Sequence, residues 1–451
     1  MASTYLTRTE SSGNRKTGTL SFWVKRSGLA NGSLNQYVYS NWNPAVSGYS
    51  SGLVQFSSAD RFEFANYQES GTGTHTNLLT NRLFRDTSAW YHIVVNWDTT
   101  QATSSDRYKM YINGVQETSF QSANYPSLNE DLYFNIGGAS NPVVIGSNYG
   151  PSNYFDGSMS HYHWIDGTAY DASAFGETDA NGVWKIIAEP SVTYGTNGFF
   201  ILKDGNSVTD QSGNGNNFTV GGGTLTNTED NPSNVFATFN NLIVVPSSSY
   251  SNGNTKAVDG AGAHKSFYGT LGFSSGKYYW EAKAVGGTKY TIGLSDVENY
   301  INYTQVALTN VIIGESSNSY GNGDAIGWYF NTLNKNGSAV ASSIHTIVTN
   351  DIMMIACDAD NGKIYYGVNG TWRVANSTTF NSADNDTTFT TGKTYAPAFS
   401  AENCGWEANF GNGYFGTTAV SSAGTNASGI GIFEYDVPTG YTALSTKGLN
   451  L

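Results

Sequence analysis

The chain has 451 residues, of which 13% are charged, 14% are aromatic and 52 are glycine, and its formal net charge is −13. Because an acidic surface repels a phosphate backbone, we expect no nucleic-acid partner. No apolar run approaches the roughly 20 residues that cross a bilayer, and the opening MASTYLTRTE lacks the basic and apolar regions of a signal peptide, so we expect neither membrane insertion nor classical export.

Composition also predicts the fold class. The chain is rich in Tyr, Phe, Asn, Ser, Thr and Gly, which favour strands and tight turns over helices. Its length exceeds that of one ordinary domain. We therefore predict an all-β protein with two antiparallel β-sandwich, jelly-roll-like domains in tandem.

The first predicted domain spans residues 1–203. It contains short strand-like runs such as TLSFWVKR, YHIVVNWD and SMSHYHWID, each bounded by Gly, Asn, Ser or Asp, as in a β-sandwich. In the run RYKMYINGV, the side chains of Tyr108, Met110 and Ile112 alternate with polar ones and are expected to face the core. Asn113-Gly114 then supplies the two positive-φ positions of a type I′ hairpin turn.

Residues 204–249 change in character. This segment is rich in turn-forming residues, and a few apolar side chains such as Phe218, Phe236 and Phe239 offer anchoring points. We interpret it as a structured connector between the two domains.

The second predicted domain spans residues 250–415, and residues 416–451 form a turn-rich tail expected to pack on that domain or on a partner. Strand-like runs resume with GKYYWEAKAV, YTIGLSD, DIMMIACDAD and KIYYGVNGTW. The last of these repeats the strand and Asn-Gly turn of the first domain, which we interpret as one solution used in two differently built sandwiches. Cys357 and Cys404 lie within strand-like runs and are expected to be buried free thiols.

These runs support a family resemblance. The series TGTLSFWVKR, AWYHIVVNWDTT, RYKMYINGV and YFDGSMSHYHWIDGTAYDASAFGE resembles the laminin-G-like, concanavalin-A-like sandwich of bacteriophage structural proteins. GKYYWEAKA, YTIGLSD, DAIGWYF, KIYYGVNGTW and WEANFG resemble a SPRY (B30.2-like) sandwich. Together with the terminal YDVPTGYTALSTKGLN, the pair looks like virion proteins of tailed bacteriophages. The resemblance implies a capsid or tail-fibre component on the virion surface, assembled in the host cytoplasm.

Concanavalin-A-like folds also include glycoside hydrolases, which need two carboxylates close together. The sequence contains no E-x-D-x-E pattern, and its nearest acidic groups, Glu130-Asp131, Asp296 with Glu298 and Asp358 with Asp360, lie beside turn residues. We therefore predict a protein that is not an enzyme and has no catalytic residues.

No cofactor is expected, apart from calcium as a candidate. His161 and His163 have i,i+2 spacing compatible with a metal, but the sequence offers no obvious third ligand. Laminin-G-like domains can bind calcium through loop carboxylates, and Asp98 and Asp156 are weak candidate donors.

Aromatic residues in polar loops provide candidate contacts for a glycan or a protein partner. Sugar rings stack on aromatic faces while amide and carboxylate groups bind their hydroxyls. The candidates lie in turn-rich segments of both domains and are Trp42, Tyr49, Tyr149, Tyr154, Tyr300, Tyr303, Tyr320 and Trp372. The alternative for each is an aromatic lid over the end of a sandwich or a subunit interface.

The sequence therefore predicts a non-enzymatic bacteriophage virion protein, displayed on capsid or tail, that contributes to attachment to a host-surface glycan or receptor. Its expected partners include other virion proteins. We also expect a homo-oligomer, with a trimer favoured, because clustered sites raise avidity. The alternatives are a purely structural decoration or assembly protein and a polysaccharide-degrading tail enzyme.

Overall fold

A computed structural model describes residues 3–30, 32, 34–42, 51–68, 74–139, 141–203, 208–243, 247–260, 262, 264–298, 312–315, 324–374 and 376–451. The chain divides into two compact units, Met1–Asn227 and Thr228–Leu451. The boundary falls within the segment expected as a connector. Phe218 belongs to the first hydrophobic core, whereas Phe239 belongs to the second.

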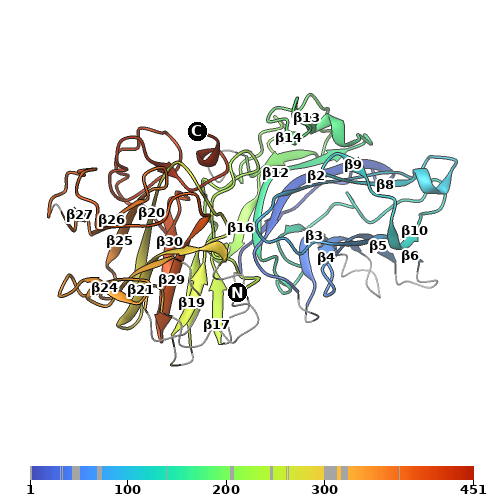
Figure 1. Cartoon of the computed structure of the whole chain (residues 1–451). Coiled ribbons are helices and arrows are strands. Elements are labelled where there is room, and N and C mark those ends of the chain that lie inside the picture. The colour runs from blue at the N-terminus through green and yellow to red at the C-terminus, as the bar shows by residue number, and fades with distance from the viewer. Residues whose placement is uncertain are drawn as a thin grey trace. The chain divides into compact units, whose positions relative to one another are not determined.

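The predicted all-β fold is confirmed. In the first unit (Figure 1), one sheet runs in the order β10 (Phe120–Asn124), β6 (Thr74–Leu83), β5 (Arg61–Gln68), β4 (Ser51–Phe56), β3 (Gln36–Trp42), β11 (Val143–Ile145), β1 (Tyr5–Arg8) and β16 (Thr219–Gly222). The other sheet runs in the order β15 (Phe199–Ile201), β12 (Gly157–Asp166), β2 (Thr17–Arg26), β7 (Tyr91–Asp98), β8 (Tyr108–Ile112) and β9 (Val115–Gln116). A hairpin of β13 (Gly176–Thr178) and β14 (Trp184–Ile186) follows β12, and the single-turn 3₁₀ helices are η1 (Ser104–Asp106) and η2 (Ala172–Ala174).

The second unit is also built from two sheets. One runs in the order β17 (Ser248–Ser251), β18 (Lys256–Asp259), β30 (Gly405–Asn409), β20 (Lys277–Val285), β25 (Ile352–Asp358), β26 (Lys363–Val368) and β27 (Thr371–Trp372), with β28 (Thr387–Thr388) beside β26 and β33 (Thr442–Ala443) beside β20. The other runs in the order β19 (Lys265–Tyr268), β29 (Tyr395–Glu402), β21 (Lys289–Asp296), β22 (Ala325–Tyr329), β23 (Thr332–Lys335) and β24 (Ser338–Ala341). The remaining elements are the hairpin of β31 (Tyr414–Phe415) and β32 (Thr418–Ala419) and the 3₁₀ turn η4 (Gly448–Asn450).

The two units share one strand order. In the first, β12-β2-β7-β8-β9 faces a sheet containing β6-β5-β4-β3-β11-β1. In the second, β30-β20-β25-β26-β27 faces β24-β23-β22-β21-β29-β19. Strands at matching positions in the two units occur in the same order along the chain. Within each unit, every pair of neighbouring strands in these series is antiparallel. The two sandwiches therefore share this core order, which local sequence patterns do not encode, and they differ at their edges, where β10 and β16 extend the first unit and β17 and β18 extend the second.

Both predicted Asn-Gly hairpins are confirmed. Asn113 and Gly114 have φ of 49° and 80°, and Asn369 and Gly370 have 48° and 85°. In each turn the asparagine also bonds to the strand that pairs with the first strand of the hairpin. Asn113 Oδ1 accepts the N–H of His92 at 2.8 Å, and Asn369 Oδ1 accepts that of Ile352 at 2.9 Å.

Alternation along the strands fills the interior of each sandwich. Tyr108, Met110 and Ile112 face the core as predicted, and Trp97 and Trp164 lie beside them fully buried. In the second unit Trp280, Trp328 and Trp406 occupy the core. Cys357 and Cys404 are buried free thiols, which confirms that prediction.

A third layer covers the outer face of one sheet in each unit. In the first unit, Phe175, Trp184 and Tyr194 come from the segment after β12 and pack with Val94 of β7. In the second unit, Phe433, Val437 and Tyr441 come from the chain after β32 and pack with residues of β20, β25 and β26. Figure 1 shows β13 and β14 beside the sheet that contains β2 and β12. The two covering layers account for apolar side chains that would otherwise face water.

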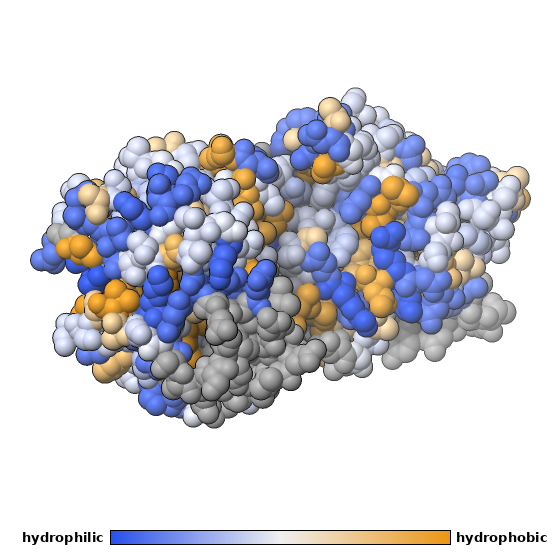
Figure 2. Space-filling view, in the orientation of Figure 1, coloured by the Kyte–Doolittle hydropathy of each residue, from blue (hydrophilic) through white to orange (hydrophobic). Residues whose placement is uncertain are grey.

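On the face drawn in Figure 2, hydrophobic residues form small patches separated by hydrophilic ones. Among the described residues, no helix is long and apolar enough to span a bilayer.

The Asn-Gly turns also pack directly against the covering layers. A Cβ added to Gly114 would lie 2.4 Å from the Trp184 ring, and one added to Gly370 would lie 3.0 Å from the Tyr435 ring. Glycine therefore serves two purposes at these turns. It adopts a positive φ, and it leaves room for an aromatic ring from a later part of the chain.

We predict that Gly114→Ala destabilises the first unit more than Gly182→Ala does. Both glycines have φ near 80°, but nothing lies within 4 Å of a Cβ at Gly182. The control should cost about 1 kcal/mol from backbone strain alone, whereas Gly114→Ala must also displace Trp184 and should cost about 3 kcal/mol. Chemical denaturation of both variants measures the difference, and equal losses would contradict the packing role of Gly114.

Candidate functional site

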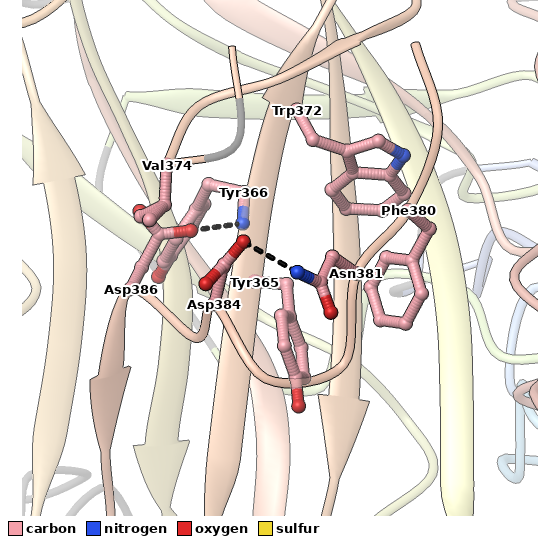
Figure 3. Close-up of a pocket in the computed structure, with 8 residues that line it drawn as sticks. All are labelled: Tyr365, Tyr366, Trp372, Val374, Phe380, Asn381, Asp384 and Asp386. Atoms are coloured by element: carbon pink, nitrogen blue, oxygen red, sulfur yellow. Dashed lines mark hydrogen bonds between the residues drawn. The ribbon is translucent and has the colours of Figure 1, made fainter. Parts of the chain in front are cut away.

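A pocket of about 190 Å³ of empty space, including its open mouth, lies on the covered side of the second unit. It is formed by β26, β27 and the loop that follows them (Figure 3). Its lining residues are Tyr365, Tyr366, Trp372, Val374, Phe380, Asn381, Asp384 and Asp386. The turn at Asn369-Gly370 folds β27 back on β26, so that Trp372 lies opposite Gly367.

Aromatic rings form the walls of the pocket. Side chains alternate along β26, so Tyr365 faces the covering layer while Tyr366 packs into the sandwich core. The Phe380 ring lies 4.8 Å from that of Tyr365 and 5.0 Å from that of Trp372, measured between centroids. These rings are held together by packing, which gives the pocket a preorganised apolar surface.

Polar groups lie next to these rings. Asn381 donates from Nδ2 to Asp384 Oδ2 at 2.6 Å, as the dashed line in Figure 3 shows. Asp386 lies deeper, where its carboxylate accepts the backbone N–H of Tyr366 at 2.7 Å and forms an ion pair with Arg373. The pocket therefore combines flat apolar walls with amide and carboxylate groups that can bind hydroxyls.

The electrostatics of the pocket are dominated by acids. Burial raises the pKa of Asp386 to about 6, and Arg373 and the N–H of Tyr366 oppose that rise. Because the guanidinium of Arg373 pairs with Asp386, its positive charge is largely neutralised. Asp384 is half-buried beside it.

Trp372 was predicted as a loop aromatic available to a partner, and the structure places it differently. Its side chain is only 4% exposed and packs between Phe380 and Tyr279. The residue follows a turn, which suggested exposure, but the later chain covers it. Trp372 forms a wall of the pocket and cannot offer an open face for stacking.

The other aromatic candidates do not gather at this pocket. Tyr149 and Tyr154 belong to the first unit and are half-buried. The Tyr154 hydroxyl donates to the carbonyl of Pro151 at 2.9 Å, and its ring lies 6.5 Å from that of Tyr5. The backbone of Trp42 ends β3, while its side chain and the residues Tyr49, Tyr300, Tyr303 and Tyr320 lie outside the described residues.

Asp98 and Asp156 do not form a common calcium site. In β2, Thr17 pairs with Asp98 and Arg26 pairs with Gly157, so the two carboxylates lie near opposite ends of that strand. Nine residue steps along a strand correspond to about 30 Å. Asp98 accepts hydrogen bonds from Thr100 and Gln101, which lower its pKa against the effect of burial. Burial raises the pKa of Asp156.

The histidine pair, His161 and His163, lies at a bulge in β12 and packs within the first unit. A bulge in β12 gives His161 a φ of 48°, and His163 is 2% exposed with Nδ1 3.0 Å from the Tyr194 hydroxyl. Burial lowers the pKa of His163 well below its ordinary value, so the ring is neutral. Within the described ranges, no group of three or more metal-ligating side chains is found.

The acidic groups considered for hydrolysis stabilise turns and ion pairs. Asp358 accepts the N–H of Asn361 at 3.0 Å and pairs with Lys277 at 3.1 Å. Asp296 accepts the N–H of Glu298 at 3.0 Å and pairs with Lys393 at 2.9 Å. Asp360 Oδ1 accepts the N–H of Gly276 at 2.8 Å.

Sequence reasoning missed the residues that accompany Trp372. Phe380, Asn381, Asp384 and Asp386 lie in the run FNSADND, which combines one aromatic residue with amides and carboxylates. That composition is the signal that could have identified the loop as part of a site. The position of this loop beside Tyr365 depends on tertiary packing and has no signature in the local sequence.

Residues 1–174 match the family model Laminin_G_3, described as the concanavalin A-like lectin/glucanases superfamily. The laminin-G-like, concanavalin-A-like character predicted for the first domain is thus confirmed. No curated protein matches the sequence.

Solved structures similar to this chain include three β-sandwich proteins. The SPRY domain of human HERC1 is 16% identical, with 38% of this chain and 96% of that chain covered and a TM-score of 0.26. The heptameric SAP-like pentraxin from Limulus polyphemus is 14% identical, with 37% and 71% covered and a TM-score of 0.26. The TRIM65 PSpry domain is 15% identical, with 38% and 91% covered and a TM-score of 0.27. The SPRY resemblance of the second half stays a prediction.

We predict that Trp372→Ala destabilises the second unit by about 3–5 kcal/mol, because it removes a buried indole and leaves a cavity. Val374→Ala provides the control, since Val374 is 42% exposed in the same loop and its truncation should change stability by at most about 0.5 kcal/mol. Guanidinium denaturation followed by tryptophan fluorescence measures both. A Trp372→Ala loss as small as the control would contradict the wall position of Trp372.

Proposed function

We propose that the protein is a non-enzymatic recognition protein that binds carbohydrate in the pocket beside Trp372. The observation that carries the proposal is the half-buried ring of Phe380, held in place by Tyr365 and Trp372, with Asn381 and Asp384 next to it. A sugar presents C–H groups to an apolar wall and hydroxyls to amide and carboxylate groups. The pocket is small, with room for about one water-sized group, so a protruding substituent at the end or edge of a glycan suits it best.

The charge of the site suggests which glycans bind. Asp384 and Asp386 line the pocket, and the cation of Arg373 is paired with Asp386. The chain carries a formal net charge of −13. Neutral and amine-bearing sugars therefore fit better than sialic acids, uronic acids or sulfated sugars, which would bring like charges together.

The biological setting we propose is the surface of a bacteriophage particle, on capsid or tail, where the protein would attach to a host-surface glycan. This part rests on the resemblance of the two-domain chain to virion proteins. Assembly into a homo-oligomer, with a trimer favoured, would raise the avidity of a weak glycan site. Rigid sandwiches with loops at their margins are suited to this role.

A second candidate function is polysaccharide hydrolysis, favoured by the presence of two carboxylates, Asp384 and Asp386, in one pocket. A raised pKa is characteristic of a general acid, and that of Asp386 is about 6. However, the bonds from Tyr366 and Arg373 hold Asp386 as an anion, which does not suit proton donation to a leaving group. Release of reducing ends from host polysaccharide, lost on Asp386→Asn, would favour the hydrolase.

A third candidate is a decoration or assembly protein whose loops bind virion neighbours. Particles that lack the protein distinguish this role from attachment. Normal adsorption of such particles to host cells would favour the assembly role.

We predict that purified protein binds neutral glycans on an array, and that Asn381→Ala or Asp384→Ala weakens this binding about tenfold through the loss of hydrogen bonds to sugar hydroxyls. Thr378→Ala is the matched control, because Thr378 is exposed in the same loop and does not line the pocket. Titration by calorimetry with the glycan of highest array signal measures the change. Equal affinity in all variants would place binding elsewhere, and preference for acidic glycans would contradict the charge argument.

A further inference from the structure

The chain that covers the second unit includes residues 424–445, which we name the C-terminal strap. It lies on the outer face of the sheet that contains β20, and its short strand β33 pairs with β20 in parallel. Phe433, Val437 and Tyr441 are 1%, 6% and 4% exposed, so the strap is well packed. Beneath it lie Tyr279 and Met354, whose side chains point away from the sandwich core.

A buried acid holds the strap at its middle. Glu281 of β20 is 0% exposed, and its carboxylate accepts four hydrogen bonds. Two come from strap backbone, the N–H of Glu434 at 2.9 Å and that of Tyr435 at 2.8 Å. The others come from the Tyr279 hydroxyl at 2.9 Å and from Asn409 Nδ2 at 3.4 Å. None of these four donors carries a positive charge.

Aromatic side chains connect this acid to the pocket. The strap residue Tyr441 lies 5.4 Å from Phe380 and 6.3 Å from Tyr365, measured between ring centroids. The strap residue Phe433, next to Glu434, lies 5.0 Å from Tyr279, which in turn lies 6.4 Å from Trp372. Each aromatic wall of the pocket is therefore within one or two ring contacts of the strap.

We propose that Glu281 is a positioning residue that latches the C-terminal strap, and that docking of the strap sets the positions of the pocket walls. Ligand binding and strap docking are then coupled, because each stabilises the same arrangement of rings. The latch stands on the geometry alone, whereas its effect on carbohydrate affinity rests on the function proposed above.

The latch responds to pH. Burial raises the pKa of Glu281 to about 7 from its ordinary value of 4.5, and the hydrogen bonds from Glu434, Tyr435, Tyr279 and Asn409 oppose the rise. A raised acid pKa means that the docked state binds the proton more tightly than the undocked state. Docking is therefore strongest near pH 4.5 and below, and it weakens as pH rises through 7.

The nearest cation by strand register is Lys283, two residues further along the same face of β20, and Glu407 of β30 lies opposite it. Tyr279 lies on the same strand, and burial raises its pKa well above the ordinary value, so it stays neutral. The strap contributes Glu434, Tyr435 and Asp436, and Asp351 precedes β25. Asn409 on β30 does not titrate. The groups that contact the Glu281 carboxylate are thus neutral hydrogen-bond donors, and burial is the main cause of its raised pKa.

The experiment measures hydrogen-exchange protection factors in the full chain at pH 5 and pH 8. The Glu434 and Tyr435 amides report the latch, and the Trp372 amide, bonded to the Ser377 carbonyl at 2.8 Å, reports the pocket wall. Protection at all three amides should fall on the order of 100-fold between these pH values. Glu281→Gln should abolish this pH dependence at the Glu434 and Tyr435 amides and reduce it at Trp372, near which Asp386 also titrates. Glu434→Gln, which removes one charge from the same strap, should keep it.

Tyr279→Phe tests the same latch with the acid intact. It removes one hydrogen bond to the carboxylate and so raises the docked-state pKa further, and the fall in protection should extend to higher pH. Unchanged protection between pH 5 and pH 8 in the wild-type chain would overturn the latch. A fall at Glu434 and Tyr435 without one at Trp372 would overturn the coupling to the pocket.

Affinity provides a separate readout. For the neutral glycan of highest array signal, affinity should fall between pH 5 and pH 8 in the wild-type chain and in Glu434→Gln. It should fall less in Glu281→Gln, where the pocket acid Asp386 still titrates in this range. An array without signal would count against the carbohydrate function, while the exchange measurements would still decide the latch. A glycan affinity that falls equally in Glu281→Gln would overturn the coupling.

Discussion

A sheet with apolar side chains on both faces must be covered on both, and this constraint shapes the two units alike. The inner faces meet to form the sandwich cores, while Val94 in the first unit and Met354 in the second point the other way. Burying such surface is worth about 25 cal/mol per Å². In each unit a later segment of the chain forms the cover, so each unit has three layers where a simple sandwich has two.

The covers are held by polar groups at corresponding strand positions. Ser21 lies opposite Val94 in the first unit, and Glu281 lies opposite Met354 in the second. Ser21 bonds to His92 Nε2 at 2.9 Å, and His92 Nδ1 accepts the indole N–H of Trp184 at 3.0 Å. Burial lowers the pKa of His92 to about 3, so this series of hydrogen bonds carries no charge. The corresponding strand position therefore holds a neutral residue, Ser21, in the first unit and an ionisable one, Glu281, in the second.

Much of the sandwich architecture follows from local sequence. The alternation around Tyr108 and the Asn-Gly turns predicted strands and hairpins, because side-chain period and backbone torsions are properties of a few adjacent residues. The wall position of Trp372 could not be predicted in this way. Its burial depends on Phe380 and on the strap beyond residue 424, whose contacts are set by tertiary packing. The shared strand order was missed for the same reason.

The covers also determine the order in which each unit can be completed. The bond between Trp184 and His92 spans 92 residues, and those from the strap to Glu281 span 153 and 154. Contacts of such long range form late and slow folding. During synthesis the outer sheet face of each unit therefore stays uncovered after its strands have formed. That interval is when apolar surface is most open to aggregation or to chaperones.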